Sequence, residues 1–122
     1  MKVKSKRETL HPPEESLQLI EACAKELSPD EDTLLAWHAR KVTIQKRRLA
    51  LDLEIVSDNV SVNRRILELG SIPLVLTTAL SRRDYDVVGC DIEPERYAAS
   101  IERTGLKVVK CNIETEKLPF RS

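Results

Sequence analysis

Two short apolar segments, each closing on a polar turn, constrain the fold of this chain most strongly. Residues 66–69 lead into Gly70, residues 87–90 lead into Asp91, and the apolar residues 74–80 between them have the length of a helix. Strands that alternate with helices are typical of βαβ units, in which right-handed crossovers join parallel strands. Because ligands of such sheets bind beyond the carboxyl ends of the strands, the same pattern predicts where a site would lie.

A third helix and a third strand continue this pattern. Pro94 suits the first position of a helix, and Gly105 is a typical residue just past the end of one. The buried face of this helix is expected to carry Tyr97, Ala98 and Ile101. Residues 107–111 form the third expected strand. The predicted fold class is therefore α/β, a Rossmann-like parallel sheet in the order 3-2-1 preceded by N-terminal helices.

The first 27 residues divide into an arm and a helix. Residues 1–11 are rich in basic side chains and carry little to bury, so a flexible basic arm is expected. Pro12 and Pro13 suit the first turn of a helix, and apolar residues then recur every three or four positions up to Leu27. This spacing predicts an amphipathic helix.

A second N-terminal helix is expected to complete a helical segment over residues 12–60. Its start resembles a capping box formed by Ser28, Pro29 and Glu31. Apolar periodicity continues to residue 56, which favours one long helix followed by a loop over residues 57–63. The alternative is a break into two helices where the polar side chains Lys46 and Arg48 interrupt the apolar stripes.

Charge argues against nucleic acid as a partner. The chain has 20 basic and 20 acidic residues, so no global field attracts an anionic polymer. A basic cluster on the expected long helix consists of Arg40, Lys41, Lys46, Arg47 and Arg48. Because no aromatic residues are interleaved for base stacking and acidic residues bracket the cluster, a solvated helix face is favoured over nucleic-acid contact.

Cysteine and histidine usage indicates neither disulfides nor a metal centre. The three cysteines are odd in number and form no C-x-x-C pair, so they are expected to be reduced and buried: Cys23, Cys90 and Cys111. His38 is expected to be a partly buried helix residue, because the other histidine, His11, lies in the arm. With no apolar run of membrane-spanning length and no signal-peptide core, a cytoplasmic protein is expected.

Gly70 and Asp91 carry the chemistry of the expected site. Gly70 follows the first strand, where the backbone must turn sharply and let a ligand approach. Asp91 stands 21 residues later at the end of the second strand, where a carboxylate can accept hydrogen bonds from both hydroxyls of a ribose. The spacing leaves a structural alternative of equal weight, in which Asp91 caps the helix that begins at Pro94.

Three motifs resemble those of class I S-adenosylmethionine-dependent methyltransferases. They are Ile-Leu-Glu-Leu-Gly at 66–70, Val-Val-Gly-Cys-Asp-Ile-Glu-Pro-Glu-Arg at 87–96 and Cys-Asn-Ile-Glu-Thr-Glu-Lys-Leu-Pro-Phe at 111–120. The resemblance covers residues 66–122 and implies that the sheet is half of a methyltransferase sheet, with S-adenosylmethionine as the cofactor. A nicotinamide-binding half fits less well, because G-x-G-x-x-G is absent.

The resemblance also implies roles for individual residues. At the methionine end of the cofactor, Glu68 would lie near the amino group, Gly70 would approach the methionine backbone, and Ser71 would border the same loop. At the adenosine end, the implied residues and roles are the ribose hydroxyls for Asp91, the adenine face for Ile92, and the adenine edge for Asn112 with the backbone of Ile113.

One departure from the family pattern supports a second hypothesis. The glycine-rich loop of the family has two further glycines, and Ile72 and Leu74 stand near those positions here. A branched side chain at Ile72 would crowd the cofactor. The alternative function is therefore a non-catalytic Rossmann-like interaction module that has lost cofactor binding.

The expected organisation leaves one edge of the sheet open. Residues 61–122 supply three strands, while the methyl acceptor and the catalytic residues of the family belong to strands that would follow Ser122. The chain alone is therefore expected to be inactive, with an unknown methyl acceptor. Because an uncovered apolar edge strand promotes association, either a C-terminal half, a second copy of the chain or the long helix is expected to cover the first strand.

Overall fold

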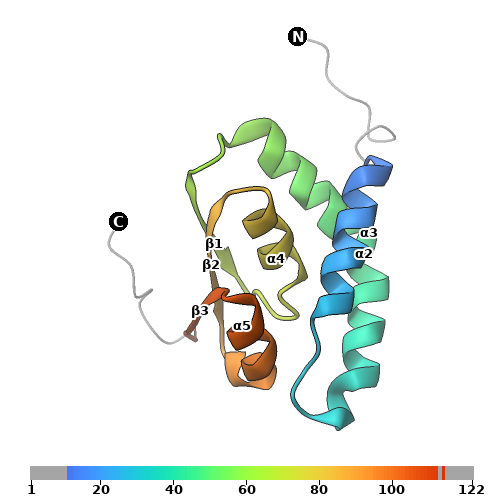
Figure 1. Ribbon diagram of the computed structural model, residues 1–122, viewed down its shortest axis with the longest axis vertical. Helices are drawn as coiled ribbons and strands as arrows, with labels where there is room; N and C mark the ends of the chain where they lie inside the picture. Colours follow the sequence, from blue (N-terminus) through green and yellow to red (C-terminus); the bar gives the residue numbers. More distant parts are fainter. Residues whose placement is uncertain (1–10, 113, 115–122) are drawn as a thin grey trace.

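The computed structural model describes residues 11–112 and 114 (Figure 1). In chain order the elements, with η marking 3₁₀ helices, are α2 (Glu14–Glu26), η1 (Asp32–Leu34), α3 (Leu35–Asn59), β1 (Arg65–Leu69), α4 (Val75–Arg82), β2 (Asp86–Asp91), η2 (Pro94–Tyr97), α5 (Ala98–Thr104) and β3 (Lys107–Lys110). The α/β class with a parallel sheet is confirmed. Within the described part of the chain, no helix combines the length and apolar character that crossing a membrane requires.

The three strands are all parallel, in the order β1-β2-β3 with β2 in the centre. In register, Leu69 lies beside Cys90, and Asp91 lies beside Lys110. The carboxyl ends of the strands therefore meet at one edge of the sheet, as parallel pairing requires. The apolar runs predicted as strands are confirmed, with boundaries shifted by one residue.

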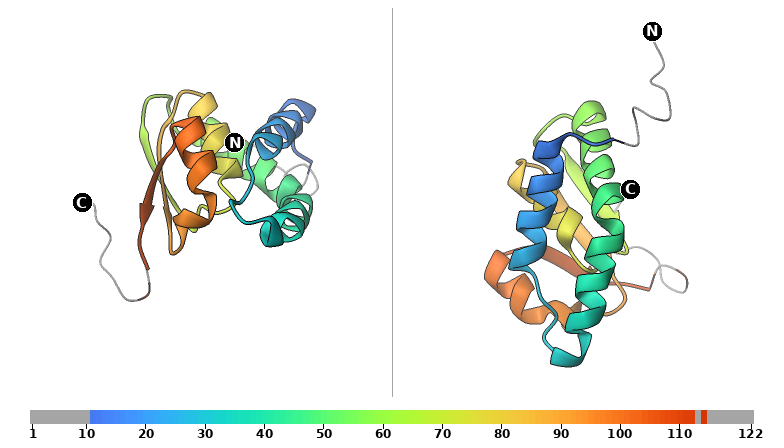
Figure 2. Two further views of the ribbon diagram at one scale, coloured as in Figure 1. Left: turned by 60° about the horizontal axis from the view of Figure 1, so that its bottom comes forward. Right: turned by 90° about the vertical axis from the view of Figure 1, so that its right-hand side faces the viewer.

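Helices cover one face of the sheet in two layers. Figure 2 shows α4 and α5 directly against the sheet, with α2 and α3 side by side beyond them. Among the described residues, no helix lies on the opposite face. The strands reflect this asymmetry, because Ile66 packs against the core whereas Leu67 and Leu69 point away and are 37% and 48% exposed.

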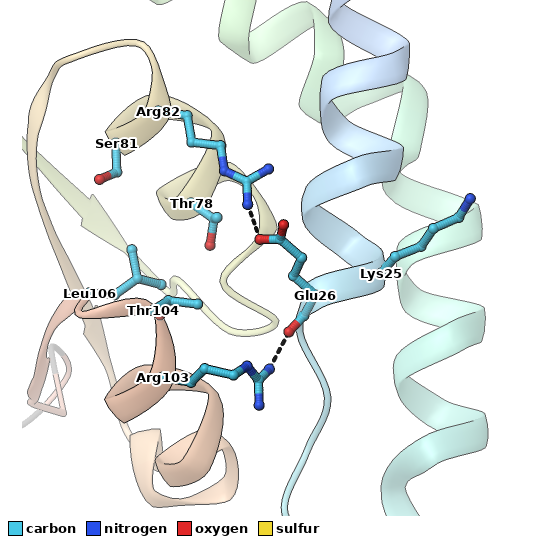
Figure 3. A pocket seen from close by; sticks show the side chains of 8 residues that line it. All are labelled: Lys25, Glu26, Thr78, Ser81, Arg82, Arg103, Thr104 and Leu106. Atoms are coloured by element: carbon cyan, nitrogen blue, oxygen red, sulfur yellow. Dashed lines mark hydrogen bonds and ion pairs between the residues drawn. The ribbon is translucent and has the colours of Figure 1, made fainter.

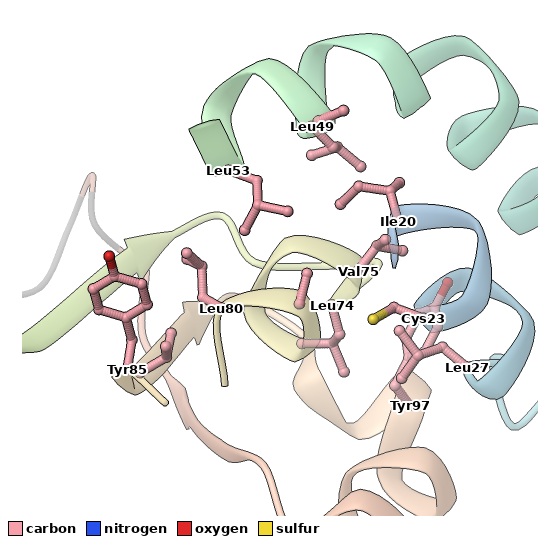
Figure 4. Close-up of a cluster of buried hydrophobic side chains, with 13 residues drawn as sticks. Ile20, Cys23, Leu27, Leu49, Leu53, Leu74, Val75, Leu80, Tyr85 and Tyr97 are labelled. Carbon is pink, nitrogen blue, oxygen red and sulfur yellow. The ribbon is translucent and has the colours of Figure 1, made fainter. Parts of the chain in front are cut away.

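The core joins the N-terminal helices to the sheet (Figure 4). Its largest fully buried side chains come from α2, α3, the β1–α4 loop, α4 and η2, and they include Ile20, Leu53, Leu74, Leu80 and Tyr97. Burying one such side chain contributes roughly 1.5–3 kcal/mol. One hydrophobic cluster therefore holds the N-terminal helices and the sheet together.

The long helix is confirmed as a single helix, but its expected start is wrong. Helix α3 begins at Leu35, and neither α3 nor η1 has a side-chain cap. The Ser28 backbone instead exchanges hydrogen bonds with the Ser100 hydroxyl, donating at 3.0 Å and accepting at 2.9 Å. Asp30 accepts from the N–H of Ala99 at 3.0 Å. Partners on α5 replace the local capping box, so residues 28–31 form a connector rather than a helix start.

Three smaller expectations are also corrected. The loop predicted over residues 57–63 starts later, because α3 continues to Asn59. Pro94 begins a 3₁₀ helix rather than an α-helix. The tighter turn brings Tyr97 and Ser100, three residues apart, to the buried side and leaves Ala98 exposed.

The prediction of buried cysteines is confirmed, and His38 is more deeply buried than expected. Cys23, Cys90 and Cys111 are all buried, and none of the three forms a disulfide. His38 is 7% exposed, and its Nδ1 lies 2.6 Å from the Tyr97 hydroxyl. Burial lowers the pKa of His38, whereas a hydrogen bond with the Ala24 backbone raises it.

Most of the predicted basic arm lies outside the described residues. His11, its last residue, has its Nδ1 2.8 Å from Nη2 of Arg47.

Gly89, in the middle of β2, packs closely against Ser71 of the β1–α4 loop. A Cβ at Gly89 would lie 2.8 Å from Oγ and 3.0 Å from Cβ of Ser71. We expect Gly89→Ala to lower the free energy of unfolding by about 1–3 kcal/mol, measured by urea denaturation. In a Ser71→Gly background the same substitution should cost much less. Equal costs in the two backgrounds would contradict this packing argument.

Candidate functional site

Two hollows meet at Gly70. The strand-end hollow has a volume of about 260 Å³ and is lined by Gly70, Cys90, Asp91, Ile92, Cys111, Asn112 and Glu114. The helix-side hollow, between α3 and the β1–α4 loop, has a volume of about 380 Å³ and is lined by Lys41, Gln45, Arg48, Leu49, Asp52, Glu68, Leu69, Gly70, Ser71, Ile72, Pro73, Val75 and Leu76. Gly70 borders both hollows.

The strand-end hollow brings together four of the predicted site residues from three separate strand ends. The Gly70 N–H donates to the Cys90 carbonyl at 2.8 Å, and the Cys111 N–H donates to the Asp91 carbonyl at 2.8 Å. These bonds extend the strand pairing past the ends of the strands and fix the positions of Gly70, Asp91 and Asn112. Ile113 lies outside the described residues.

Gly70 itself is shaped for close approach. Its φ is +67°, a left-handed conformation that favours glycine, and an added Cβ would meet nothing within 4 Å. The space above Gly70 is therefore open. Gly70 therefore presents its backbone, without a covering side chain, to both hollows.

The Asp91 carboxylate is anchored by backbone groups on both of its oxygens. One oxygen accepts from the N–H of Ile72 at 2.9 Å, and the other accepts from Ile92 at 2.8 Å and from Glu93 at 3.4 Å. The structural alternative, in which Asp91 caps the helix that begins at Pro94, is wrong, because the N-cap position of η2 is Glu93 and η2 has no side-chain cap. Asp91 instead stabilises the turn before η2 and holds the β1–α4 loop. Because an ionised carboxylate offers about four acceptor sites, capacity remains for further donors.

Glu68 faces the helix-side hollow. It accepts a hydrogen bond from the Thr77 hydroxyl. The pKa of Glu68 is raised from 4.5 to about 7, and burial is the largest cause. The hydrogen bond from Thr77 lowers this pKa, whereas the nearby charges of Asp52 and Asp91 raise it. Glu68 therefore exchanges its proton near neutral pH. In the same hollow Ser71 is 4% exposed, and its hydroxyl has no hydrogen-bond partner among the described residues.

The two residues that replace glycines of the family pattern take different positions. Leu74 has a φ of +72° and is fully buried in the core, so its side chain lies away from both hollows. Ile72 lines the helix-side hollow and packs against the core. Any crowding of a ligand in this loop therefore comes from Ile72 and not from Leu74.

Helix α3 contributes side chains that the site prediction missed. They form a polar stripe, spaced four, three and four residues apart, that lines the helix-side hollow: Lys41, Gln45, Arg48 and Asp52. Spacing of this kind places side chains on one face of a helix. Lys41 and Arg48 belong to the basic cluster for which the sequence favours a solvated helix face, and the polar spacing along α3 is the signal that could have placed them at a site.

A larger hollow than these two lies elsewhere and is lined by no predicted site residue. It measures about 660 Å³ and lies near the C-terminal ends of α2, α4 and α5 (Figure 3). There Arg82 pairs with the Glu26 carboxylate, and Arg103 donates to the Glu26 carbonyl. The positive charges of Arg82 and Arg103 balance the Glu26 carboxylate and the negative C-terminal ends of the helices. Their role is therefore structural.

No family model, curated protein or solved structure matches this chain. The resemblance to methyltransferases therefore remains a prediction. Across residues 11–112 and 114, no cluster of three His, Cys, Asp or Glu side chains could hold a metal ion.

The raised pKa of Glu68 makes stability depend on pH. Since the fold raises this pKa from 4.5 to about 7, the folded chain binds the proton more tightly than the unfolded chain. The resulting stabilisation is present below pH 4.5 and is lost as the pH rises through 7. We expect the free energy of unfolding of the wild type to fall by about 1–3 kcal/mol relative to Glu68→Gln between pH 5 and pH 8.

Urea denaturation across this pH range measures the effect, with Glu102→Gln, an exposed position on α5, as the matched control. The control should follow the wild type at every pH. A Glu68→Gln variant whose stability runs parallel to that of the wild type would show that Glu68 does not titrate in this window.

Proposed function

We propose that this chain is the S-adenosylmethionine-binding portion of a class I methyltransferase. The observation that carries the proposal is the strand-end hollow, in which Gly70, Asp91, Ile92 and Asn112 line one concavity from three strand ends. These residues belong to three separate sequence motifs. Their convergence fits a ligand with an adenosyl group.

The chemistry of the strand-end hollow suits adenosine. Asp91 retains acceptor capacity for ribose hydroxyls, and Ile92, 52% exposed, offers an apolar surface to a purine. Asn112 accepts the N–H of Glu114 at 3.0 Å through Oδ1, which leaves its amide N–H groups for the adenine edge. Donors, acceptors and an apolar contact are thus all present.

The open space over Gly70 suits the remainder of the cofactor. The strand-end hollow alone, at about 260 Å³, falls below the roughly 300–1,000 Å³ typical of ligand pockets. A ligand that extends past Gly70 also occupies the helix-side hollow, where Glu68 and Ser71 lie. When bound, the cofactor supplies an electrophilic methyl group, and the role of these residues is to hold and orient its two ends.

Isothermal titration calorimetry with S-adenosylhomocysteine tests the proposal. We expect one binding site in the wild type and an affinity at least tenfold lower in Asp91→Asn, because the charge-assisted bonds to the ribose are lost. Asp58→Asn, an exposed change near the end of α3, is the matched control and should bind like the wild type. Circular dichroism verifies that Asp91→Asn remains folded. No heat of binding in the wild type would reject the function.

A second candidate function is a non-catalytic interaction module. The observation that favours it is the sheet face that no described helix covers, where Leu67 and Leu69 of the edge strand β1 are 37% and 48% exposed. Parallel sheets are normally covered on both faces, and open apolar edges promote association.

This candidate predicts self-association through β1. Sedimentation velocity should show a dimer at tens of micromolar, and Leu69→Lys should restore the monomer without changing the far-ultraviolet circular dichroism. Arg65→Lys, an exposed change on the same strand that keeps the charge, is the control and should leave the dimer intact. A monomeric wild type that binds S-adenosylhomocysteine would decide against this candidate.

A further inference from the structure

The outer face of α3 carries a stripe of exposed apolar side chains. Ile44 and Ile55 are 72% and 59% exposed, and Leu51, which lies between them in the sequence, is partly buried. Spacings of seven and four residues place these three side chains on one face of a helix. Leu49 and Leu53 of the same helix are buried in the core. At about 100° per residue the two leucines lie on the opposite side of α3 from Ile44, so the stripe faces solvent.

The neighbouring helix α2 has no such stripe. Figure 2 shows α2 and α3 side by side in the layer farthest from the sheet. The exposed residues of α2 are charged, polar or small, and they include Glu15, Gln18 and Ala22. Within the described part of this layer, all exposed large apolar side chains belong to α3. Aligned apolar residues on the solvent side of a helix are typical of a surface that packs against another molecule.

Charge divides α3 into two opposite halves. Residues 40–48 contain five basic side chains and no acidic one, whereas residues 51–58 contain three acidic side chains and no basic one. A second copy of α3 in antiparallel orientation would place its acidic half against the basic half of the first, and the reverse at the other end. A parallel orientation would instead bring like charges together. The charge pattern of α3 is therefore complementary to itself in the antiparallel orientation.

We propose that α3 is a self-association surface on which a second copy of this chain packs antiparallel. Pairing about the midpoint of residues 49–50 sets Ile44 opposite Ile55 of the second copy. The same register sets Lys41 opposite Asp58 of the second copy, and two-fold symmetry repeats both contacts. The apolar stripe and the charges of α3 are thus satisfied in one arrangement.

Lys41 and Asp58 are available for this contact. Within residues 11–112 and 114, neither forms an ion pair within 4 Å, whereas Lys46 of the basic half pairs with Glu21. At about 1.5 Å per residue, the paired segment spans about 26 Å of helix. A contact of one helix with another is small for a protein interface, so a weak and reversible dimer is expected.

This surface is separate from the proposed cofactor site. None of Ile44, Leu51 and Ile55 is among the residues that line the two hollows at Gly70. Self-association is measured without a ligand, so a failure to bind S-adenosylhomocysteine would leave the α3 surface standing. A monomeric chain would likewise leave cofactor binding standing.

Sedimentation velocity over tens to hundreds of micromolar tests the proposal on the full chain. We expect the wild type to dimerise reversibly. Ile44→Lys should raise the dissociation constant about tenfold or more, because each copy then places a charge in the apolar contact. Ala39→Lys, which adds the same charge at an exposed position on another face of α3, is the matched control and should dimerise like the wild type. Far-ultraviolet circular dichroism verifies that both variants keep their helices.

Charge reversal tests the antiparallel register. Lys41→Glu and Asp58→Lys should each weaken the dimer, because each substitution places like charges opposite one another. The variant that combines both substitutions should dimerise like the wild type, because both pairs are restored with their signs exchanged. A combined variant as weak as either single one would overturn the antiparallel register.

Two other outcomes would overturn the proposal. One is a wild type that stays monomeric throughout this concentration range. The other is a dimer that Leu69→Lys dissociates and Ile44→Lys leaves intact, which would assign self-association to the edge of β1.

Discussion

The geometry of both hollows depends on the hydrogen bonds that the Asp91 carboxylate accepts. This carboxylate closes the turn after β2 through the N–H groups of Ile92 and Glu93, and it reaches across to the N–H of Ile72 in the β1–α4 loop. One side chain therefore holds the position of Ile72 in the β1–α4 loop relative to the turn after β2. These backbone contacts are compatible with the proposed ligand-binding role of Asp91. A carboxylate held by backbone donors is already oriented for any further donor that a ligand presents.

The β1–α4 loop keeps its shape with few glycines because burial offsets strain. Leu74 occupies a left-handed conformation that costs an ordinary residue roughly 1–2 kcal/mol, and burying its side chain in the core contributes a similar or larger amount. Its N–H donates to the Ser71 carbonyl at 2.6 Å, and its carbonyl accepts from Thr78 at 3.0 Å as α4 begins. The left-handed conformation that glycine adopts without steric cost is stabilised at Leu74 by the burial of its side chain.

Local sequence patterns predicted the strands, whereas contacts between residues far apart in the sequence determined where helices begin and how residues 28–31 are bound. Short apolar runs at 66–69 and 87–90 predicted β1 and β2, and parallel pairing then brought Gly70, Asp91 and Asn112 to one edge. The capping box at Ser28 failed because Ser100 and Ala99, about seventy residues away, bind the same segment. The spacing of residues within the segment 28–31 cannot predict that partners on α5 will bind it. The 3₁₀ turn at Pro94 likewise moved Ala98 outward, which helical periodicity alone could not indicate.

Helix α3 illustrates how one element can serve the core and a site at once. Leu49 and Leu53 are buried in the cluster with α2 and α4, while Arg48 and Asp52, one residue before each, turn toward the β1–α4 loop. Adjacent positions on a helix differ by about 100°, so a wide apolar face and a polar stripe can border one another. The packing of Leu49 and Leu53 thereby determines where Arg48 and Asp52 lie relative to Glu68. Helix α3 is thus part of the framework of the helix-side hollow, because the contacts that bury its apolar face also position the charged side chains that line this hollow.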